Sequence, residues 1–255
     1  MGQFDHRHAL ITGGGSGIGA AIARALAGAG AAVSIAGRRK APLDAVASSL
    51  AKATAIVADI TKEADCAAMV AAARAAHGPI DIVIANAGAA ASAPAAKIDL
   101  AQWQQAIDVN LTGAFLTVSA ALADVTRKDA GSRRIVFIAS TAGLKGYPYV
   151  AAYCAAKHGI VGLARSLSIE LAATGVTVNA VCPGYTDTPL LDEAAAKIAA
   201  KTGRTTDQSR AMLAKDNVHG RLITPDEVAQ TVLWLCSPEA ASINGQAIAV
   251  TGGPI

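Results

Sequence analysis

Apolar residues come in short runs along this chain, and most runs are followed by a segment in which apolar positions recur every three or four residues. Leu43, Val46, Ala47 and Leu50, for example, fall at the spacing that places side chains on one face of a helix. The short runs have the length of buried strands. They predict strands over residues 8–12, 32–36, 54–58, 80–85, 134–139, 177–181 and 246–250.

Strands and helices that alternate this regularly predict an α/β fold, in which a Rossmann-type, doubly wound parallel sheet of about seven strands carries helices on both faces. No linker, repeat or low-complexity segment divides the 255 residues, so we expect one domain over 1–255. In such folds ligands bind at the carboxyl ends of the strands. Four predicted strands are followed there by unusual residues, namely Thr12-Gly13, Asn86-Ala87-Gly88, Ser140 and Pro183-Gly184.

Composition narrows the range of functions. Hydrophobic residues make up 53% of the chain and charged residues 16%, which suits a large buried sheet. The net charge of +3 is scattered along the chain, which argues against a nucleic-acid partner. We expect neither a secretory signal nor an apolar run that spans a membrane, and therefore a cytoplasmic protein. The four cysteines and five histidines lack zinc-ligand spacing, so we expect buried thiols and no catalytic metal.

The first predicted strand leads into a glycine-rich turn, Thr12-Gly13-Gly14-Gly15-Ser16-Gly17-Ile18-Gly19, and a helical stripe begins at Ile18. Glycines let the backbone turn tightly and approach a pyrophosphate, while the next helix offers free N–H groups and the positive end of its dipole. Because the turn lies between a strand and a helix, it indicates a dinucleotide site rather than a merely flexible loop.

The second predicted strand is followed by Gly37-Arg38-Arg39-Lys40, where NAD-binding folds carry an acidic residue for the ribose hydroxyls. Two guanidiniums without a carboxylate favour a 2′-phosphate, so we expect an NAD(P)(H) cofactor with a preference for NADP(H). Arg38 lies nearer the strand end and is the better candidate. The alternative is that both arginines are solvated charges at a helix start.

Tyr153 and Lys157 stand one helical turn apart, which places a phenol and an ammonium on one face. A tyrosine hydroxyl titrates near about 10, so a neighbouring cation would help it to exchange a proton at neutral pH. Taken alone, the pair could equally be an exposed aromatic residue and a solvated lysine.

The chain carries, in order, the glycine-rich turn 12–19, Asn86-Ala87-Gly88, Asn110, Ser140, the pair Tyr153 and Lys157, and Pro183-Gly184. This ordered set resembles the short-chain dehydrogenase/reductase family over nearly the whole chain. The resemblance implies a catalytic tetrad of Asn110, Ser140, Tyr153 and Lys157. Tyr153 would exchange a proton with the substrate oxygen, and Ser140 would hold that oxygen. Lys157 would lower the pKa of the phenol and bind the nicotinamide ribose. Asn110 would hold a water for proton relay, although it could also tie down a helix kink.

The same resemblance implies the cofactor contacts. Asp59 would lie near the adenine, Asn86 on the adenosine side, and Thr186 at the nicotinamide carboxamide. Two positions depart from the family's usual residues, Ala85 where asparagine is common and Thr186 where an aliphatic residue is common. The full set expected to bind the cofactor is Thr12, Gly13, Gly15, Ser16, Gly17, Ile18, Gly19, Arg38, Arg39, Asp59, Ile60, Asn86, Ala87, Gly88, Tyr153, Lys157, Pro183, Gly184, Thr186 and Thr188.

Residues 187–221 fall where the family has a mobile substrate lid. The cations of this segment could attract the phosphates of an acyl-CoA or an acyl carrier group, or they could form a solvated helical surface. They are Lys197, Lys201, Arg204, Arg210 and Lys215. The side chains expected to line the substrate pocket are Ser140, Leu144, Lys145, Tyr147, Tyr153 and Tyr185.

Similarity to the family's 3-oxoacyl thioester reductases and 3-hydroxyacyl dehydrogenases implies hydride transfer between a nicotinamide and a 3-hydroxyacyl or 3-oxoacyl thioester. The alternatives are another secondary alcohol or ketone, cyclic or steroid-like, and a dinucleotide sensor without turnover, which the presence of Tyr153 and Lys157 disfavours. The family also implies a homotetramer or homodimer, with the apolar segment 246–253 near an interface.

Overall fold

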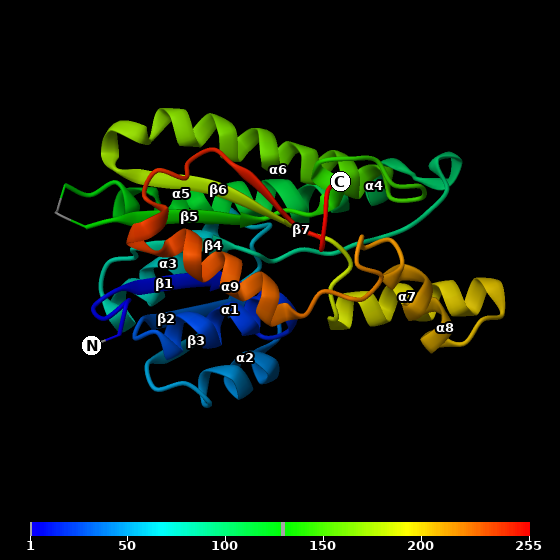
Figure 1. The fold of residues 1–255 in the computed structure, drawn as a ribbon. Helices are drawn as coiled ribbons and strands as arrows, with labels where there is room; N and C mark the ends of the chain where they lie inside the picture. Colours follow the sequence, from blue (N-terminus) through cyan, green and yellow to red (C-terminus); the bar gives the residue numbers. More distant parts are fainter. Residues whose placement is uncertain (1, 129–130) are drawn as a thin grey trace.

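The computed structural model of the chain describes residues 2–128 and 131–255, and over these ranges it contains one sheet of seven parallel strands between two layers of helices (Figure 1). The sheet order is β3-β2-β1-β4-β5-β6-β7. The strands are β1 (His8–Thr12), β2 (Ala32–Gly37), β3 (Ala53–Val57), β4 (Ile82–Ala85), β5 (Arg133–Ile138), β6 (Val176–Pro183) and β7 (Ala247–Val250). The predicted α/β fold is confirmed. The first predicted strand has the observed bounds of β1, and the other six differ from theirs by one or two residues at one or both ends.

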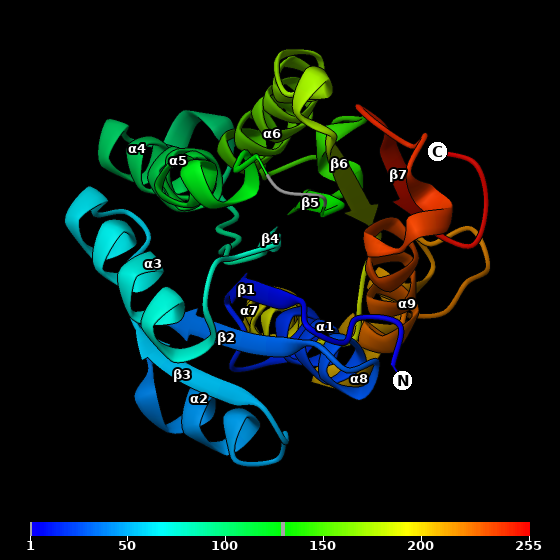
Figure 2. The same ribbon diagram turned by 90° about the vertical axis from the view of Figure 1, so that its left-hand side faces the viewer.

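Helices cover both faces of the sheet (Figure 2), and neighbouring side chains of a central strand pack on opposite faces. Ile11 of β1 belongs to the core under α1 (Gly17–Gly28), α2 (Lys40–Ala47) and α9 (Pro225–Cys236). Its neighbour Leu10 belongs to the core under α3 (Glu63–His77), α5 (Gly113–Val125) and α6 (Ala151–Glu170). Because helices cover both faces, the central strands β1, β4, β5 and β6 are buried along their whole length, which explains the mainly apolar runs in the sequence.

The strand order reverses between β1 and β4, which pair in the centre of the sheet. The carboxyl ends of these two strands are joined by Thr12, whose Oγ1 accepts hydrogen bonds from the backbone N–H groups of Asn86 and Ala87 at 3.1 and 3.2 Å. A reversal of this kind opens a crevice at the strand ends. The fold therefore places its ligand crevice between the glycine turn after β1 and the segment after β4.

The helical stretch Leu100–Val125 combines α4 (Leu100–Ile107), a π-helical turn η2 (Asp108–Thr112) and α5. By length and composition it could cross a membrane, so the expectation that no apolar run reaches that length was wrong on this measure. Apolar core helices pass the same test, and Ala114, Val118 and Ala121 of α5 are buried in the core. The apolar character of α5 therefore follows from its position against the sheet.

Two further helices, α7 (Pro189–Thr202) and α8 (Thr206–Ala214), stand beyond the carboxyl edge of the sheet (Figure 1). Leu191, Ala195 and Leu213 are buried between them and form a small core of their own. The Thr188 and Thr205 side chains cap the N-termini of α7 and α8 respectively. The predicted lid segment thus contains a helical hairpin.

Candidate active site

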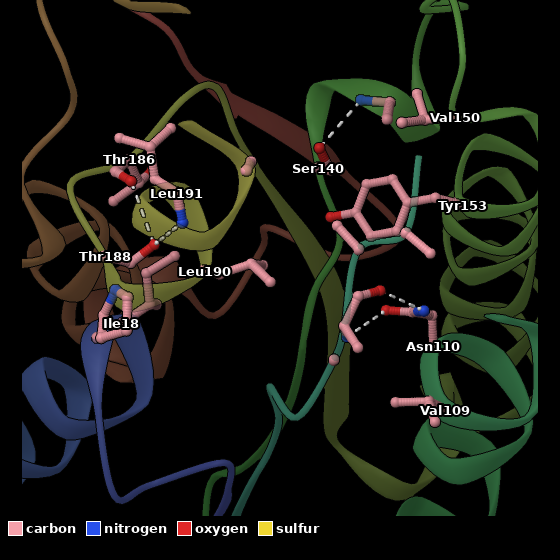
Figure 3. Close-up of a pocket in the computed structure, with 18 of the residues that line it drawn as sticks. Ile18, Val109, Asn110, Ser140, Val150, Tyr153, Thr186, Thr188, Leu190 and Leu191 are labelled. Carbon is pink, nitrogen blue, oxygen red and sulfur yellow. Dashed lines mark hydrogen bonds between the residues drawn. The ribbon is translucent and has the colours of Figure 1, made fainter. Parts of the chain in front are cut away.

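A cleft of about 890 Å³ lies at the carboxyl ends of the strands. One wall carries Ser140, Tyr153 and Asn110, and the other carries Ile18, Thr188 and Leu190 (Figure 3). The first wall comes from the segment after β5, from α6 and from η2, whereas the second comes from α1 and the start of α7. The cleft therefore brings together segments that are distant in the sequence.

The glycine turn at the base of this cleft has the shape of a phosphate cradle. Gly13 and Gly17 have φ values of 68° and 51°, which disfavour residues with side chains. A Cβ atom at Gly19 would lie only 2.3 Å from the Gly13 carbonyl oxygen. Ser16, which precedes α1, makes no side-chain capping hydrogen bond among the described residues, so the first N–H groups of α1 have no hydroxyl acceptor there. The turn thus offers backbone N–H groups, a surface without side chains that a ligand can approach closely, and a helix N-terminus. Together these features fit a pyrophosphate.

The outer end of the cleft is lined by Arg38, Arg39, Asp59 and Ile60. The Asp59 carboxylate accepts hydrogen bonds from the Thr61 backbone N–H at 3.1 Å and from its hydroxyl at 2.8 Å. These bonds lower the pKa of Asp59, and the positive charge of Arg38 adds to the effect. Because both guanidiniums are exposed, this end of the cleft presents two cations beside one fixed carboxylate.

Tyr153 and Lys157 lie on consecutive turns of α6, as their spacing predicts. The Tyr153 phenol is half-buried, whereas Lys157 is only 4% exposed and its Nζ donates a hydrogen bond to the Ile138 carbonyl at 2.8 Å. The ammonium lies 5.6 Å from the centre of the Tyr153 ring. The two side chains therefore form a close pair inside the cleft.

Burial dominates the acid–base behaviour of this pair. It raises the pKa of Tyr153 to about 12, against the opposing effect of a hydrogen bond with Ser140. It lowers the pKa of Lys157 to about 8. The net direction for Tyr153 is opposite to the lowering expected from a neighbouring cation, because the cost of placing a charged phenolate in the cleft is larger. At neutral pH the phenol therefore carries its proton.

Ser140 follows β5 directly, and its Oγ accepts a hydrogen bond from the Ala142 N–H at 3.1 Å. This bond holds the hydroxyl on the cleft wall that also carries Tyr153 (Figure 3). A polar group fixed at a strand end beside a proton donor can orient a substrate oxygen.

Asn110 is 1% exposed and lies in the π-helical turn η2. Its Nδ2 donates to the carbonyls of Ala106 and Ala89, and its Oδ1 accepts from the Ala89 N–H. The amide therefore ties the helix irregularity to the segment after β4, as the second interpretation of this residue predicted. A Cβ atom at Gly88 would lie 2.8 Å from Asn110 Oδ1 and 3.6 Å from Lys157 Nζ, so this asparagine also stands close to the ammonium.

Three of the predicted site residues lie outside the cleft lining. Thr12 is buried beneath it and joins β1 to the segment after β4. Leu144 packs against the core, and Lys145 places its Nζ 5.3 Å from the centre of the Tyr147 ring. All other positions predicted for catalysis, cofactor binding or the substrate pocket line the same cleft. Of the five lid cations, Lys197, Lys201 and Arg204 line it, whereas Arg210, which is paired with Asp187 and Asp192, and Lys215 do not. Leu144 and Lys145 point elsewhere because Thr141–Gly143 form a tight 3-10 turn that redirects the chain after Ser140.

Sequence reasoning missed several parts of the lining, among them residues 89–94, Tyr149, and the residues Leu190 and Leu191 of α7. Residues 89–94 form one wall, and Tyr149 stands at the mouth with 64% of its surface exposed. The position of 89–94 directly after Asn86-Ala87-Gly88 was a usable signal. Tyr149 adopts a φ of 67°, which is rare for a residue with a side chain, and nothing in the sequence indicates it.

A model of the short chain dehydrogenase family matches residues 7–199, and the chain belongs to this family. It is 40% identical to the cis-4-hydroxycyclohexanecarboxylate dehydrogenase of Sinomonas cyclohexanicum, over 99% of this chain and 98% of that protein. Two solved structures are similar. A variant of actinorhodin polyketide ketoreductase with NADPH has a TM-score of 0.92 at 35% identity, covering 98% of this chain and 97% of that one. The 3-ketoacyl-(acyl-carrier-protein) reductase of Brucella melitensis, complexed with NADH, has a TM-score of 0.88 at 33% identity, covering 98% of each chain.

Family membership and these relatives make the protein an oxidoreductase that uses a nicotinamide cofactor on a secondary alcohol or ketone. The resemblance identified from the motifs is thereby confirmed.

Proposed function

We propose that the protein transfers hydride between NADP(H) and a 3-hydroxyacyl or 3-oxoacyl thioester. The observation that carries the thioester is the position of three lid cations, Lys197, Lys201 and Arg204, which line the same cleft as Ser140 and Tyr153. Cations that line a carbonyl-reacting site away from the reacting groups fit a substrate whose acyl chain is attached to a phosphate-bearing carrier group, such as CoA. The 3-ketoacyl-(acyl-carrier-protein) reductase among the similar structures supports the same substrate class.

In this proposal the glycine turn and the start of α1 hold the pyrophosphate, and Pro183, Gly184, Thr186 and Thr188 hold the nicotinamide end. The bound nicotinamide supplies or accepts the hydride. Tyr153 gives its proton to the substrate oxygen during reduction and takes it back during oxidation. The phenol carries its proton at neutral pH and can therefore donate it in the reductive direction.

Lys157 and Ser140 both support this proton transfer. Ser140 holds the substrate oxygen, and the ammonium of Lys157 stabilises the phenolate that remains after the proton has left. Asn110 keeps the segment after β4 next to Lys157. We propose that the proton leaves the site by way of Lys157 and Asn110.

The preference for NADP(H) rests on Arg38 and Arg39, which line the outer end of the cleft with exposed guanidiniums. Such groups bind a 2′-phosphate by charge-assisted hydrogen bonds. Comparison of kcat/KM for NADPH and NADH tests this part, and a clear preference for NADH would contradict it.

The thioester is tested by the double variant Lys201→Ala/Arg204→Ala. We expect KM to rise for a CoA ester and to stay constant for a short thioester that lacks phosphates. Lys215→Ala is the matched control, because Lys215 is an exposed cation of the same hairpin outside the cleft lining. Equal effects on both substrates would remove the reason for the phosphate-bearing carrier group.

A second candidate substrate is a cyclic secondary alcohol or ketone. Tyr147, Tyr149 and Tyr185 all line the cleft, and the rings of Tyr147 and Tyr185 meet edge to face with centroids 6.2 Å apart. Such an aromatic wall suits a flat ring, and the cyclohexane-type dehydrogenase among the relatives favours the same class. A side-by-side turnover screen of 3-hydroxyacyl-CoA esters and cyclic alcohols separates the two candidates.

We also propose that the chain forms a single domain with 187–221 as its lid, and that the protein is cytoplasmic. We further propose that it assembles as a homotetramer. Leu100 and Phe115 on the stretch α4–α5, Ile169 on α6 and Trp234 on α9 are large apolar side chains with 46–80% of their surface exposed. Apolar side chains of this kind are typical of subunit interfaces. Light scattering on the purified protein tests the oligomeric state.

A further inference from the structure

The two ends of the segment 187–221 meet at one joint beside the cleft. The segment leaves after Thr186 and returns at Ile223, and these two residues pair as a parallel bridge. Asp187 N–H donates to the Ile223 carbonyl at 2.8 Å, and Ile223 N–H donates to the Tyr185 carbonyl at 2.9 Å. The joint thus fixes how the α7–α8 hairpin leaves the body of the protein.

Asn217 is the side chain that completes this joint. It is 3% exposed, and its Oδ1 accepts from Tyr185 N–H at 2.9 Å. Its Nδ2 donates to the Tyr185 carbonyl at 2.8 Å and to the Arg221 carbonyl at 2.7 Å. Both amide hydrogens and the amide oxygen are therefore used, and a single side chain satisfies both backbone groups of Tyr185.

The local backbone is shaped around this asparagine. A Cβ atom at Gly184 would lie 2.2 Å from Asn217 Oδ1, a distance at which something must shift. The next neighbour of that Cβ outside the asparagine would be Thr251 Cγ2 at 3.6 Å, an ordinary contact. Room for Asn217 is thus a reason for a glycine at position 184.

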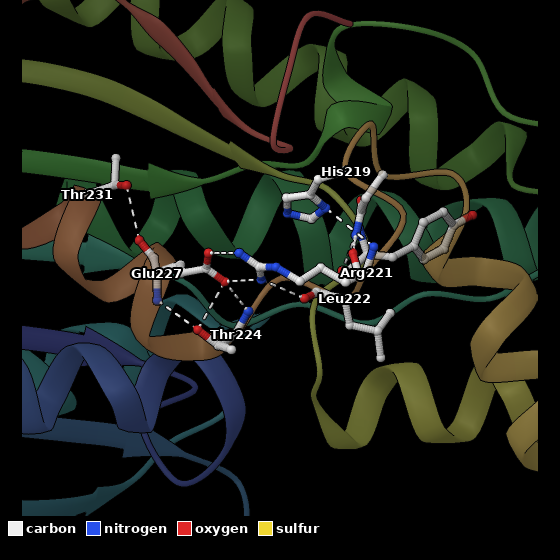
Figure 4. Close-up of polar contacts among 8 residues, drawn as sticks. His219, Arg221, Leu222, Thr224, Glu227 and Thr231 are labelled. Carbon is white, nitrogen blue, oxygen red and sulfur yellow. Dashed lines mark hydrogen bonds and ion pairs between the residues drawn. The ribbon is translucent and has the colours of Figure 1, made fainter.

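The outer side of the joint is closed by Arg221, which donates two hydrogen bonds to the Glu227 carboxylate and one to the Leu222 carbonyl (Figure 4). Glu227 also accepts from the Thr224 N–H and forms the capping box of α9. This network anchors the returning end of the segment to α9. Asn217 bonds to both Arg221 and Tyr185 and so links this anchored end to Tyr185.

Tyr185 connects the joint to the reacting end of the cleft. Its half-buried ring lines the cleft, meets the ring of Tyr147 and packs against the small core of the α7–α8 hairpin. Tyr147 in turn donates a hydrogen bond from its hydroxyl to Thr141 Oγ1 at 2.8 Å, next to Ser140. A shift of the Tyr185 backbone would therefore move an aromatic wall beside the reacting groups.

We propose that Asn217 is a positioning residue, which acts through Tyr185 to hold the loop 183–188 and the aromatic wall in place relative to Ser140 and Tyr153. The kinetic test of this inference rests on the proposed function, whereas the test by thermal unfolding does not. Asn217 touches neither the reacting groups nor the cleft, and its effect is on the geometry of the residues that do.

The kinetic test compares Asn217→Ala with Asn179→Ala. Asn179 is the matched control, because it is 1% exposed and also bridges backbone groups, those of Ile243 and Gln246, outside the cleft lining. We expect Asn217→Ala to raise KM for the alcohol or ketone on the order of tenfold or more, since small displacements of positioning groups have effects of that size. Asn179→Ala should leave KM unchanged. Equal kinetics in the two variants would overturn the proposal.

Asn217→Asp gives a second variant with the same shape. It keeps an acceptor for the Tyr185 N–H but loses both N–H donors, and it places a carboxylate against two carbonyl oxygens. We expect the same rise in KM, with unchanged affinity for ADP-ribose, which reports the distant adenosine end alone. Unchanged KM in this variant would also contradict the proposal.

A double-mutant cycle tests the joint without any turnover. Gly184→Ala should lower the thermal midpoint clearly in the wild-type background, because its methyl group meets Asn217. It should change the midpoint little in the Asn217→Ala background, where the clash is gone. Additive shifts would refute the structural part of the inference. A wild-type protein without turnover would count against the proposed function and leave this cycle intact as a test.

Discussion

Replacement of Lys157 by methionine should abolish turnover and yet make the protein more stable at neutral pH. Lys157 is 4% exposed, and burial lowers its pKa from 10.5 to about 8. A shift of this size corresponds to about 3 kcal/mol of unfavourable free energy for holding the charged ammonium in the folded state. Loss of the hydrogen bond to Ile138 removes about 1 kcal/mol of stabilisation, so the net gain of Lys157→Met is about 2 kcal/mol at pH 7.

The pH dependence of this gain identifies its cause. The pKa of Lys157 is lower in the folded than in the unfolded state, so the unfolded state binds the proton more tightly between about pH 8 and pH 10.5. The stability of the wild type therefore rises over this window, and the cost of the buried charge falls to roughly 1 kcal/mol at pH 9.5. The advantage of the methionine variant should shrink by about 2 kcal/mol between pH 7 and pH 9.5.

Urea unfolding of wild type and Lys157→Met at these two pH values measures the difference directly. Lys215→Met is the matched control, because it replaces an exposed lysine at the C-terminal end of α8 and leaves the buried Lys157 in place. A methionine variant that is less stable than wild type at pH 7, or a difference that does not change with pH, would refute the reasoning.

Three further predictions follow from single contacts. Tyr153→Phe should lower kcat by roughly 10²- to 10⁴-fold, the usual contribution of a positioned proton donor. The dissociation constant of NADPH in fluorescence titrations should change far less, because only one of many cofactor contacts is altered. Arg38→Ala/Arg39→Ala should lower the ratio of kcat/KM for NADPH to that for NADH by roughly tenfold or more, whereas an unchanged ratio would show that the arginines are solvated charges. Arg221→Ala should raise the pKa of Glu227 from about 2 toward its ordinary 4.5, because the hydrogen bonds from Arg221 are the main cause of its lowering. An NMR titration of the Glu227 side chain measures this pKa, and an unchanged value would contradict the prediction.

The strands and most of the cleft could be predicted from the sequence because parallel strands buried on both faces leave an unmistakable pattern. Apolar runs mark them, and polar or glycine residues follow where they end, as at Gly13 and Ser140. In a parallel sheet these ends meet at one edge, so a list of strand-end residues is close to a list of cleft residues. Thr12, Leu144 and Lys145 were misplaced. Thr12 is buried beneath the cleft, and Leu144 and Lys145 follow a turn whose direction the sequence does not reveal.

Other features depend on tertiary contacts and could not be predicted. The pKa of Tyr153 rises because of burial, which is a property of the folded cleft and not of the spacing to Lys157. Asn110 sits in a π-helical turn within a stretch whose composition is simply that of an apolar helix. Asn217 gives no signal either, since its partners Tyr185 and Gly184 lie more than thirty residues earlier in the chain.

The most direct test of the central claim is the rate of NADPH oxidation by wild type and Tyr153→Phe with a 3-oxoacyl thioester, followed by the absorbance of the reduced nicotinamide. We predict clear turnover by the wild type and a loss of at least about a hundredfold in the variant. Turnover that survives the substitution would contradict Tyr153 as the proton donor, and a wild type that turns over neither thioesters nor cyclic ketones would contradict the proposed function itself.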